Sequence, residues 1–308
     1  MTTLIIGSSG LVGRNLAHSL THEGESVVCM DLNLELTPDL PRSTVIQGDV
    51  SKFADISETI QKFKPDTVIN LAYLVGRNAC LQDLNRTLRV NILGMDNVFR
   101  ASADANVSRV VWASTLGVYS SIDYTPGLIV TEDSPRPYSP YSSFDGSYYN
   151  ALKHFNEYQA LLYASREALD ICAIRPSFIF GPGRTTGVPW ACNFVEDAIS
   201  GRTTNVPLHP DSTFGLIYVD DVVDLFTKVT LAKTLASNVY NTGGHLFSIA
   251  EIAREINSVL HGTLTPDPTK TPTFQFDISN DRARKEFEFK LSPFPESLIK
   301  HASVLNSK

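Results

Sequence analysis

Short apolar runs alternate with longer segments of helical periodicity through the first 175 residues of this chain. Strands that are separated by single helices are joined by right-handed crossovers, so this order predicts a parallel sheet with helices on both faces. The run Val110–Ala113 is apolar throughout, as is typical of a strand buried on both sides. The expected strands are Thr3–Ile6, Ser26–Met30, Thr44–Gln47, Thr67–Leu71, Arg109–Ser114 and Asp170–Ile174. The expected helices are Val12–Thr21, Ile56–Phe63, Leu84–Ala105 and Tyr149–Ala168. The sequence therefore predicts the α/β class with a doubly wound parallel sheet.

Two regions interrupt this rhythm. Residues 120–147 are rich in Ser, Tyr and Pro and predict a long loop, a feature that is often functional in compact α/β domains. The alternation weakens again after Pro176, although a last helix is expected at Ile249–Leu260. We expect a main domain of residues 1–175 and 216–244, with Leu216–Leu235 and Val239–Thr242 returning to the main sheet. The smaller domain is then residues 176–215 and 245–308.

Composition limits the classes of partner. The 308 residues are 43% hydrophobic, carry a formal net charge of −7 and contain no Lys/Arg run longer than two, which speaks against binding nucleic acid or an anionic membrane. No apolar stretch approaches 18 residues, and a strand begins almost at Met1, so neither a membrane span nor a secretory signal is expected. The four scattered cysteines indicate reduced core residues and a cytoplasmic protein. The seven histidines form no ligand cluster, so no metal is expected.

A glycine-rich turn lies between the first strand and the first helix. Gly7 would form the tight turn, Gly10 would let the backbone approach a diphosphate, and Gly13 would allow close packing of helix on strand. Leu11 and Val12 open the helix, whose N-terminus offers unpaired N–H groups and a positive dipole end. The pattern predicts a dinucleotide site, against the alternative of a purely structural turn.

Asp31 ends the second strand, near the offset of the acidic residue that accepts hydrogen bonds from the adenosine ribose. Its carboxylate would repel a 2′-phosphate, and neither Leu32 nor Asn33 supplies a compensating charge. The expected cofactor is therefore NAD, not NADP. A strand-end aspartate can also serve only as a turn cap, and that alternative stays open here.

Tyr149 and Lys153 are four residues apart on an expected helix and so share one face. A nearby ammonium favours the phenolate, so we expect a lowered pKa for Tyr149 and an acid/base role with an alcohol/ketone pair. The alternative is a solvated pair without chemical function.

Taken in order along the chain, these motifs resemble the extended short-chain dehydrogenases/reductases, the NAD-dependent epimerase/dehydratase family. The resemblance covers most of the chain and implies a Rossmann-type sheet with a smaller C-terminal substrate-binding domain. It rests on the glycine turn, Gly48-Asp49-Val50, Asn70-Leu71-Ala72, Val90-Asn91, Ala113–Tyr119, Tyr149-x-x-x-Lys153, Arg175-Pro176, Gly181-Pro182-Gly183, Tyr218–Val222 and Asn241–Gly244.

The resemblance implies a role for individual residues. Thr115 would hydrogen-bond the substrate oxygen while Tyr149 exchanges the proton, and Lys153 would bind the nicotinamide ribose and tune Tyr149. The remaining cofactor contacts that it implies are Asp49 and Val50 at the adenine, Leu71 and Ala72 along the cofactor, and Ser114, Pro176 and Phe178 near the nicotinamide.

Departures from the family pattern bear on the substrate. Family dehydratases carry acidic residues directly after the catalytic Thr, where this chain has Leu116 and Gly117. Nucleotide-sugar enzymes of the family commonly bind the diphosphate with an Arg where this chain has Phe214, and with a second basic residue near Thr271–Phe274. Loss of both weakens charge-assisted binding of a diphosphate.

We therefore expect an NAD-dependent oxidoreductase acting on the CH–OH or ketone group of a small sugar-like or secondary alcohol. A nucleotide-sugar epimerase with tightly bound NAD is the alternative, and a non-catalytic NAD-binding regulator is the third. Arg77 and Arg184 could supply anion contacts from other loops, or be plain surface residues. Relatives pair the helices Leu84–Ala105 and Tyr149–Ala168 into a four-helix bundle, which implies a homodimer.

Overall fold

The structure is a computed structural model that describes residues 1–120, 122, 125–135 and 144–307, without the side chains of residues 77 and 144–147. A seven-stranded sheet with the order β11-β7-β5-β4-β1-β2-β3 forms its centre, and all its strands are parallel. Its strands are β1 (Thr2–Ile6), β2 (Ser26–Asp31), β3 (Ser43–Gln47), β4 (Thr67–Asn70), β5 (Arg109–Ala113), β7 (Asp170–Arg175) and β11 (Val239–Asn241). The strand order reverses between β1 and β4, as in Rossmann folds, so the predicted α/β class and doubly wound sheet are confirmed.

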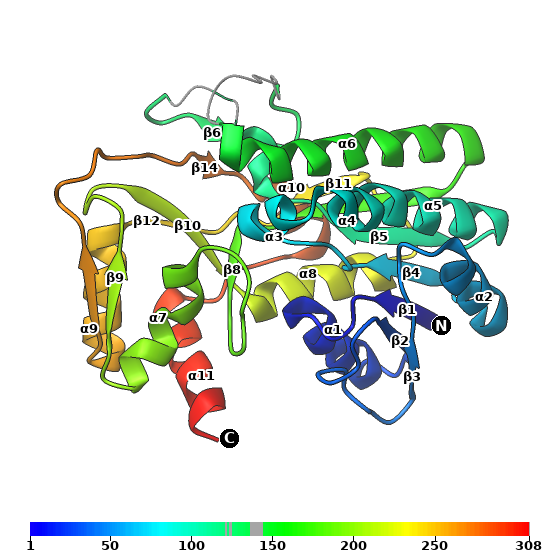
Figure 1. Ribbon diagram of the computed structural model, residues 1–308, viewed down its shortest axis with the longest axis horizontal. Coiled ribbons are helices and arrows are strands. Elements are labelled where there is room, and N and C mark those ends of the chain that lie inside the picture. Colours follow the sequence, from blue (N-terminus) through cyan, green and yellow to red (C-terminus); the bar gives the residue numbers. More distant parts are fainter. Residues whose placement is uncertain (121, 123–124, 136–143, 308) are drawn as a thin grey trace.

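Helices cover both faces of this sheet (Figure 1). One face carries α1 (Leu11–His22), α8 (Val219–Leu231) and α10 (Asp281–Phe287). The other carries α2 (Phe53–Phe63), α5 (Gly94–Asp104) and α6 (Phe144–Glu167), with α3 (Arg77–Gln82) and α4 (Leu84–Leu88) beside α6. Alternate strand residues feed the two cores: Ile5 packs with Leu16 of α1, whereas Leu4 packs with Val98 of α5. Successive side chains of a strand point to opposite faces of the sheet, and here helices bury both faces. This explains why the strands are continuously apolar.

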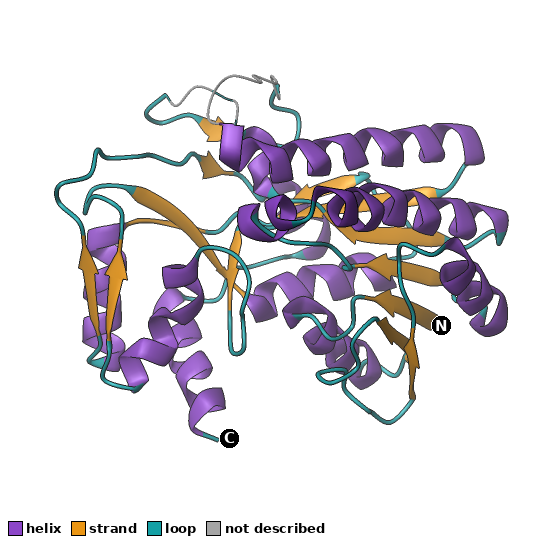
Figure 2. Ribbon diagram, in the orientation of Figure 1, coloured by secondary structure: helices purple, strands orange, loops and turns teal. Residues whose placement is uncertain are grey.

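The smaller sheets and α7, α9 and α11 gather at one end of the main sheet (Figure 2). The strands there are β8 (Phe178–Phe180), β10 (Thr213–Tyr218) and β12 (His245–Ser248) in one sheet, and β9 (Thr203–Val206) with β13 (Thr263–Pro266) in another. The helices are α7 (Pro189–Ile199), α9 (Ile249–Leu260) and α11 (Phe294–Asn306). The expected helix at 249–260 is present with a capping box at Ser248 and Glu251.

Three expectations need correction. The segment Leu84–Ala105 is not one helix, because a π-helical turn, η1 (Arg89–Leu93), separates α4 from α5. Helix α6 begins at Phe144, five residues before Tyr149, and the short strand β6 (Ile129–Val130) lies within the expected loop, part of which is outside the described residues. Of the segments expected to rejoin the main sheet, β11 does so, whereas β10 pairs with β8 and β12. The division into two domains stays a prediction.

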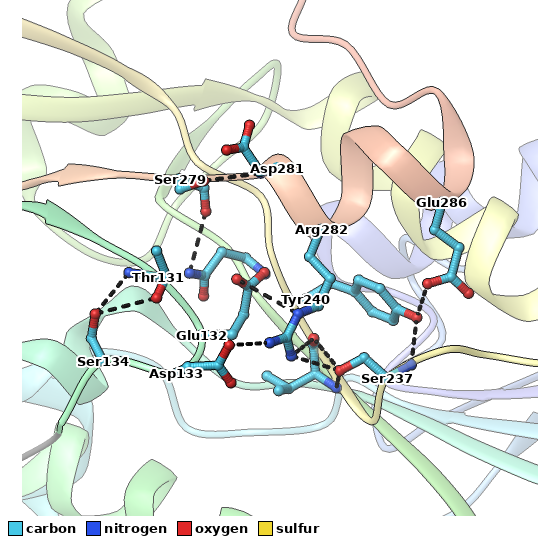
Figure 3. Close-up of polar contacts among 12 residues, drawn as sticks. Thr131, Glu132, Asp133, Ser134, Ser237, Tyr240, Ser279, Asp281, Arg282 and Glu286 are labelled. Carbon is cyan, nitrogen blue, oxygen red and sulfur yellow. Dashed lines mark hydrogen bonds and ion pairs between the residues drawn. The ribbon is translucent and has the colours of Figure 1, made fainter.

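Residues 277–282 of the C-terminal segment contact the described part of the long loop (Figure 3). Strand β14 (Asp277–Ile278) pairs with β6, and Arg282 of α10 forms an ion pair with Asp133 at 2.8 Å. Glu132 is buried, and its Oε1 accepts a hydrogen bond from the backbone N–H of Asn241 at 2.8 Å. The loop is thereby attached both to β11 and to α10.

Within the described part of the chain, no helix is both long and apolar enough to cross a membrane.

Candidate active site

The carboxyl ends of the central strands bring together the residues that the motifs singled out. Gly7 follows β1, and its N–H donates to Met30 O of β2 at 2.9 Å. Leu71 follows β4 with its N–H bonded to Ile6 O, and Ser114 follows β5 with its N–H bonded to Ile174 O. In open α/β sheets, ligands bind outside these strand ends, next to the point where the strand order reverses.

The glycine turn has no space for side chains at its first and third glycines. Gly7 has a φ of +92°, and a Cβ there would lie 2.6 Å from the backbone N of Ala72. A Cβ on Gly13 would lie 2.2 Å from Gly7 O. These contacts hold the first turn of α1 directly against β1 and the end of β4, in agreement with the packing role predicted for Gly13.

The N-terminus of α1 fits a diphosphate. Gly10 is its N-cap, and no side-chain hydrogen bond caps the helix among the described residues. The first turn, which begins with Leu11 and Val12, contains no acidic residue. The first N–H groups of a helix have no intrahelical partner and face a positive dipole end. The residues present here therefore suit the anionic part of a dinucleotide.

Asp31 lies beside this turn. One carboxylate oxygen accepts a hydrogen bond from the N–H of Ser9 at 2.9 Å, and the other accepts one from the N–H of Asn33 at 3.1 Å. Each carboxylate oxygen has a second lone pair for another donor. The turn-cap alternative and the ribose role are thus compatible, and the ribose role stays a prediction.

The predicted adenine residues lie after β3. Asp49 Oδ1 accepts hydrogen bonds from both the N–H and the hydroxyl of Ser51, at 2.9 and 2.7 Å. Val50 is buried, and its carbonyl accepts a hydrogen bond from Asn97 of α5 at 3.0 Å. Both side chains are therefore held in place by α5 and the turn that precedes α2.

Thr115, Tyr149 and Lys153 are brought together, as predicted. The Thr115 side chain lies close enough to the Tyr149 phenol to act on its pKa, in the direction that lowers it. Thr115 Oγ1 accepts a hydrogen bond from the N–H of Gly117 at 3.0 Å, as the N-cap of the 3-10 turn η2 (Leu116–Tyr119). Lys153 lies one turn along α6, with its Nζ 5.9 Å from the centre of the Tyr149 ring.

The ammonium of Lys153 contacts a backbone carbonyl and an aromatic ring. It donates a hydrogen bond to Ala113 O at 2.6 Å and lies 3.3 Å from the centre of the Tyr73 ring. Burial lowers the pKa of Lys153 to about 7, although Cys80 and Glu157 act in the opposite direction. Tyr73 also packs edge-on against Tyr149, with ring centres 5.8 Å apart. Sequence reasoning missed Tyr73, whose only signal was its place directly after Asn70-Leu71-Ala72.

The expected lowering of the Tyr149 pKa is wrong for the chain by itself. Burial raises it, and the Cys80 thiol adds to this effect, whereas the charge of Arg184 and the Thr115 side chain oppose it. The Lys153 ammonium is directed to Ala113 O. Tyr149 is consequently a neutral phenol at neutral pH, the form that donates a proton.

A buried polar network supports α6 from below. Ser114 Oγ donates to Glu157 at 2.6 Å, and Glu157 forms a two-pronged ion pair with Arg175 at 2.7 and 2.8 Å. Arg175 also donates to the hydroxyl of Tyr119. The hydroxyl of Ser114 is thus turned toward Glu157, and its predicted position near the nicotinamide stays a prediction. Glu157 was missed, although the spacing Tyr149-Lys153-Glu157 continues one face of the helix.

The π-helical turn is tied to the same site. Asn91 within it bonds to both backbone groups of Leu74, at 2.8 and 3.1 Å, and its own carbonyl accepts a hydrogen bond from Asn156 at 3.0 Å. Asn156 Oδ1 in turn accepts a hydrogen bond from the Tyr73 hydroxyl at 3.0 Å. The Asn91 carbonyl thus helps, through Asn156, to position the Tyr73 ring over Lys153.

The other predicted cofactor residues border the site. Leu71 and Ala72 are half-buried beside Gly7. Pro176 is buried, and its carbonyl accepts the N–H of Leu116 at 3.0 Å. Phe178 of β8 is half-buried and carries the guanidinium of Arg184 over its ring, 4.6 Å from the centre.

The two departures from the family pattern have structural counterparts. A Cβ on Gly117 would lie 2.1 Å from Asn150 Oδ1, so an acidic side chain at this position requires a shift of α6 or of Asn150. Phe214 is buried between Phe178 and Trp190, at ring-centre distances of 5.4 and 4.9 Å. An aromatic cluster thus occupies the place of a diphosphate-binding arginine. Across the described residues, no group of three or more His, Cys, Asp or Glu side chains could hold a metal ion.

Residues 3–243 match the sequence model of the NAD dependent epimerase/dehydratase family. The chain belongs to this family. The predicted family is confirmed, and NAD, the predicted cofactor, is the one that the family description names.

Two curated relatives show the range of the family. The chain is 29% identical over 241 residues to a UDP-glucose 4-epimerase of Mycolicibacterium smegmatis, covering 74% of this chain and 72% of that protein. It is 28% identical over 259 residues to the human short-chain dehydrogenase/reductase family 42E member 1, covering 80% of this chain but only 61% of that protein.

Solved structures agree in fold. MoeE5 in complex with UDP-glucuronic acid and NAD superposes with a TM-score of 0.83 at 22% identity, covering 100% of this chain and 99% of that chain. The GalE-like L-threonine dehydrogenase of Cupriavidus necator, in its holo form, superposes with a TM-score of 0.82 at 18% identity, covering 99% and 100%. At these identities the likeness establishes the Rossmann fold and not the substrate.

Proposed function

We propose that this protein is an NAD-dependent oxidoreductase that interconverts a secondary alcohol and a ketone on a small sugar-like or related substrate. The observation that carries the proposal is the placement of Tyr149 beside Thr115, with the Lys153 Nζ 5.9 Å from the centre of the Tyr149 ring on the same face of α6. A proton donor, a second hydroxyl and a cation at one strand end are what such a reaction needs.

The residues divide the work as follows. Thr115 orients the substrate oxygen, and Tyr149 gives its proton to that oxygen when a ketone is reduced or removes it when an alcohol is oxidised. Lys153 provides positive charge near the phenol, held by Ala113 O and Tyr73. NAD, when bound along Gly7–Gly13 and Asp31, supplies or accepts the hydride.

An NAD-retaining nucleotide-sugar epimerase is the second candidate, favoured by the similarity to the mycobacterial UDP-glucose 4-epimerase. The same Tyr149 chemistry serves both reactions, since an epimerase oxidises and re-reduces one carbon. The aromatic cluster around Phe214 argues for the first candidate, because it offers no charge to a diphosphate.

A screen for NAD reduction tests the proposal, with sugars, sugar acids, hydroxy acids and secondary alcohols alongside UDP- and dTDP-sugars. A dehydrogenase gives net NADH with its alcohol. Conversion of a nucleotide sugar without net NADH identifies the epimerase instead, and NAD binding without turnover of any substrate identifies the regulator.

Tyr149→Phe is expected to lose at least about three orders of magnitude in kcat while it still binds NADH, because only the exchangeable proton is removed. Turnover is followed by absorbance and NADH binding by fluorescence. Full turnover of this variant would show that another group moves the proton.

We also propose a cytoplasmic homodimer. The four described cysteines are all free and buried, which suits a reducing compartment.

A further inference from the structure

We propose that Arg184 binds a carboxylate of the substrate beside Tyr149, so that the substrate is a hydroxy acid or the corresponding keto acid. This inference rests on the proposed oxidoreductase function and assigns its substrate class. Arg184 follows the Gly181-Pro182-Gly183 turn at the end of β8.

Arg184 is half-buried, and no carboxylate partner for it is found among the described residues. Its Nε is buried and has no hydrogen-bond partner among the described residues. The guanidinium lies over the Phe178 ring, and the side chains of Cys192 and Tyr149 are close enough to act on its pKa. By contrast, the buried Arg109 and Arg175 pair with Asp170 and Glu157, each at 2.7 Å. A buried donor left unpaired calls for a partner outside the chain.

Local packing keeps this guanidinium in place. The guanidinium lies over the Phe178 ring, with its central carbon 4.6 Å from the ring centre. Gly187, at a φ of +121°, leaves room for it, because a Cβ there would lie 2.9 Å from the Phe178 ring and 3.2 Å from Arg184 Nη2. The loop at Gly76 lies against Gly187, so the site is bordered from the β4 side as well. The guanidinium is therefore bordered by the Phe178 ring and by Gly187, and its buried Nε–H has no partner among the described residues.

The position of Arg184 relates it to the reaction. Phe178 is expected to border the nicotinamide end of the cofactor, and the charge of Arg184 acts on the Tyr149 phenol. A group held by Arg184 thus lies close to the oxygen that Tyr149 protonates. An anion there would also neutralise the charge that opposes protonation of Tyr149.

A carboxylate fits better than a diphosphate. A carboxylate carries one charge and binds one guanidinium through two parallel hydrogen bonds. A diphosphate needs several cations, whereas Phe214 and Trp190 fill the neighbouring position with apolar rings.

Calorimetric binding to the protein–NADH complex tests the inference without turnover. The probes are malonate and its uncharged analogue malonamide, and the variants are Arg184→Met, Arg184→Lys and Arg254→Met. Arg254 is an exposed arginine of α9 and serves as the matched control. We expect Arg184→Met to bind malonate at least about tenfold more weakly, Arg184→Lys to retain part of the affinity, and Arg254→Met to equal the wild type.

Equal malonate affinity in the wild type and Arg184→Met, or no preference of the wild type for malonate over malonamide, overturns the inference. NADH affinity shows that each variant is folded. A second arm compares NAD reduction by L-threonine and 3-hydroxybutyrate with that by their methyl esters. Turnover of esters and acids alike refutes the role of Arg184 but keeps the oxidoreductase. Absence of turnover with every alcohol counts against the oxidoreductase, while the malonate result still decides whether Arg184 binds a carboxylate.

Discussion

At the scale of single residues, two buried cations show how the surroundings of a side chain set its pKa. Lys153 lies one helical turn before Glu157 on α6, and Arg175 of β7 forms a two-pronged ion pair with the Glu157 carboxylate. Burial acts to lower the pKa of Arg175, yet its bonds to Glu157 raise it above the ordinary value. Lys153 has a carbonyl and an aromatic ring instead, and burial lowers its pKa to about 7. Strand β7 thus holds a permanent charge at Arg175, whereas α6 holds one at Lys153 whose pKa is near neutral.

This titration predicts a pH-dependent stability. Between the ordinary lysine value of 10.5 and about 7, the unfolded chain holds a proton that folded Lys153 does not. The free energy of unfolding therefore falls as the pH falls through that range, by up to about 1.4 kcal/mol per pH unit for this one group. Below about pH 7 both states are protonated and the decline stops. Lys153→Met is expected to remove this slope.

Urea unfolding at intervals between pH 6 and pH 9.5 measures the effect. The stability of Lys153→Met relative to the wild type should rise as the pH falls toward 7 and then level off. A constant difference across this range would mean that Lys153 keeps an ordinary pKa in the folded chain.

At the scale of elements, α6 joins catalysis to folding. Its inward face carries Tyr149 and Lys153 toward the site and Glu157 toward Arg175 of β7, which is 2% exposed at the side chain. Replacing Glu157 by Gln leaves the Arg175 charge buried without its counter-ion, which should lower the free energy of unfolding by about 3–5 kcal/mol. Denaturant unfolding at pH 7 gives this number.

Arg254→Met, which removes a 3.8 Å surface contact with Glu251, is the control, with an expected change below about 1 kcal/mol. In the double variant Glu157→Leu/Arg175→Met, stability should largely return, because no isolated charge remains. A Glu157→Gln loss no larger than that of the control would show that the pair is dispensable.

The elements also show what the sequence can and cannot predict. The ends of strands β1, β2, β4 and β5 were predicted to within a residue or two. Short apolar runs between helical segments, and the glycine turns that follow them, are local signals in the sequence. The π-turn at Asn91 was missed, since an i→i+5 bond leaves no mark on hydrophobic spacing. Tyr73 and Cys80 were not predicted as neighbours of Lys153, because they are distant from it in the sequence and only the fold brings them close. The spacing predicted the Tyr149–Lys153 pair. It did not predict the burial of the two side chains, which is the main cause of both pKa shifts.

At the scale of the whole molecule, one face remains apolar where the helices meet solvent. Figure 1 shows α5 and α6 lying alongside each other, with α4 beside them. Large apolar side chains are exposed there on α4, η1 and α6: Leu84, Leu88, Leu93, Phe155, Tyr158, Leu161 and Leu162. Exposed apolar side chains that gather on neighbouring helices are typical of an interaction surface. Together with the family resemblance, this supports the proposed homodimer, in which a second copy covers the same helices.

Because a two-fold contact repeats every substitution on both copies, one charge on this face should suffice to separate them. We expect light scattering of the wild type at micromolar concentration to give twice the chain mass of 33.9 kDa, and Leu161→Glu to give the single mass. Leu161 is 48% exposed, so its replacement costs the folded monomer little. Ile299→Glu on α11, at a residue 54% exposed and outside this patch, is the matched control and should leave the dimer intact. A wild-type mass of 33.9 kDa would refute the dimer. Separation by both variants would mean that the contact lies elsewhere, because an added surface charge is not expected to reduce solubility.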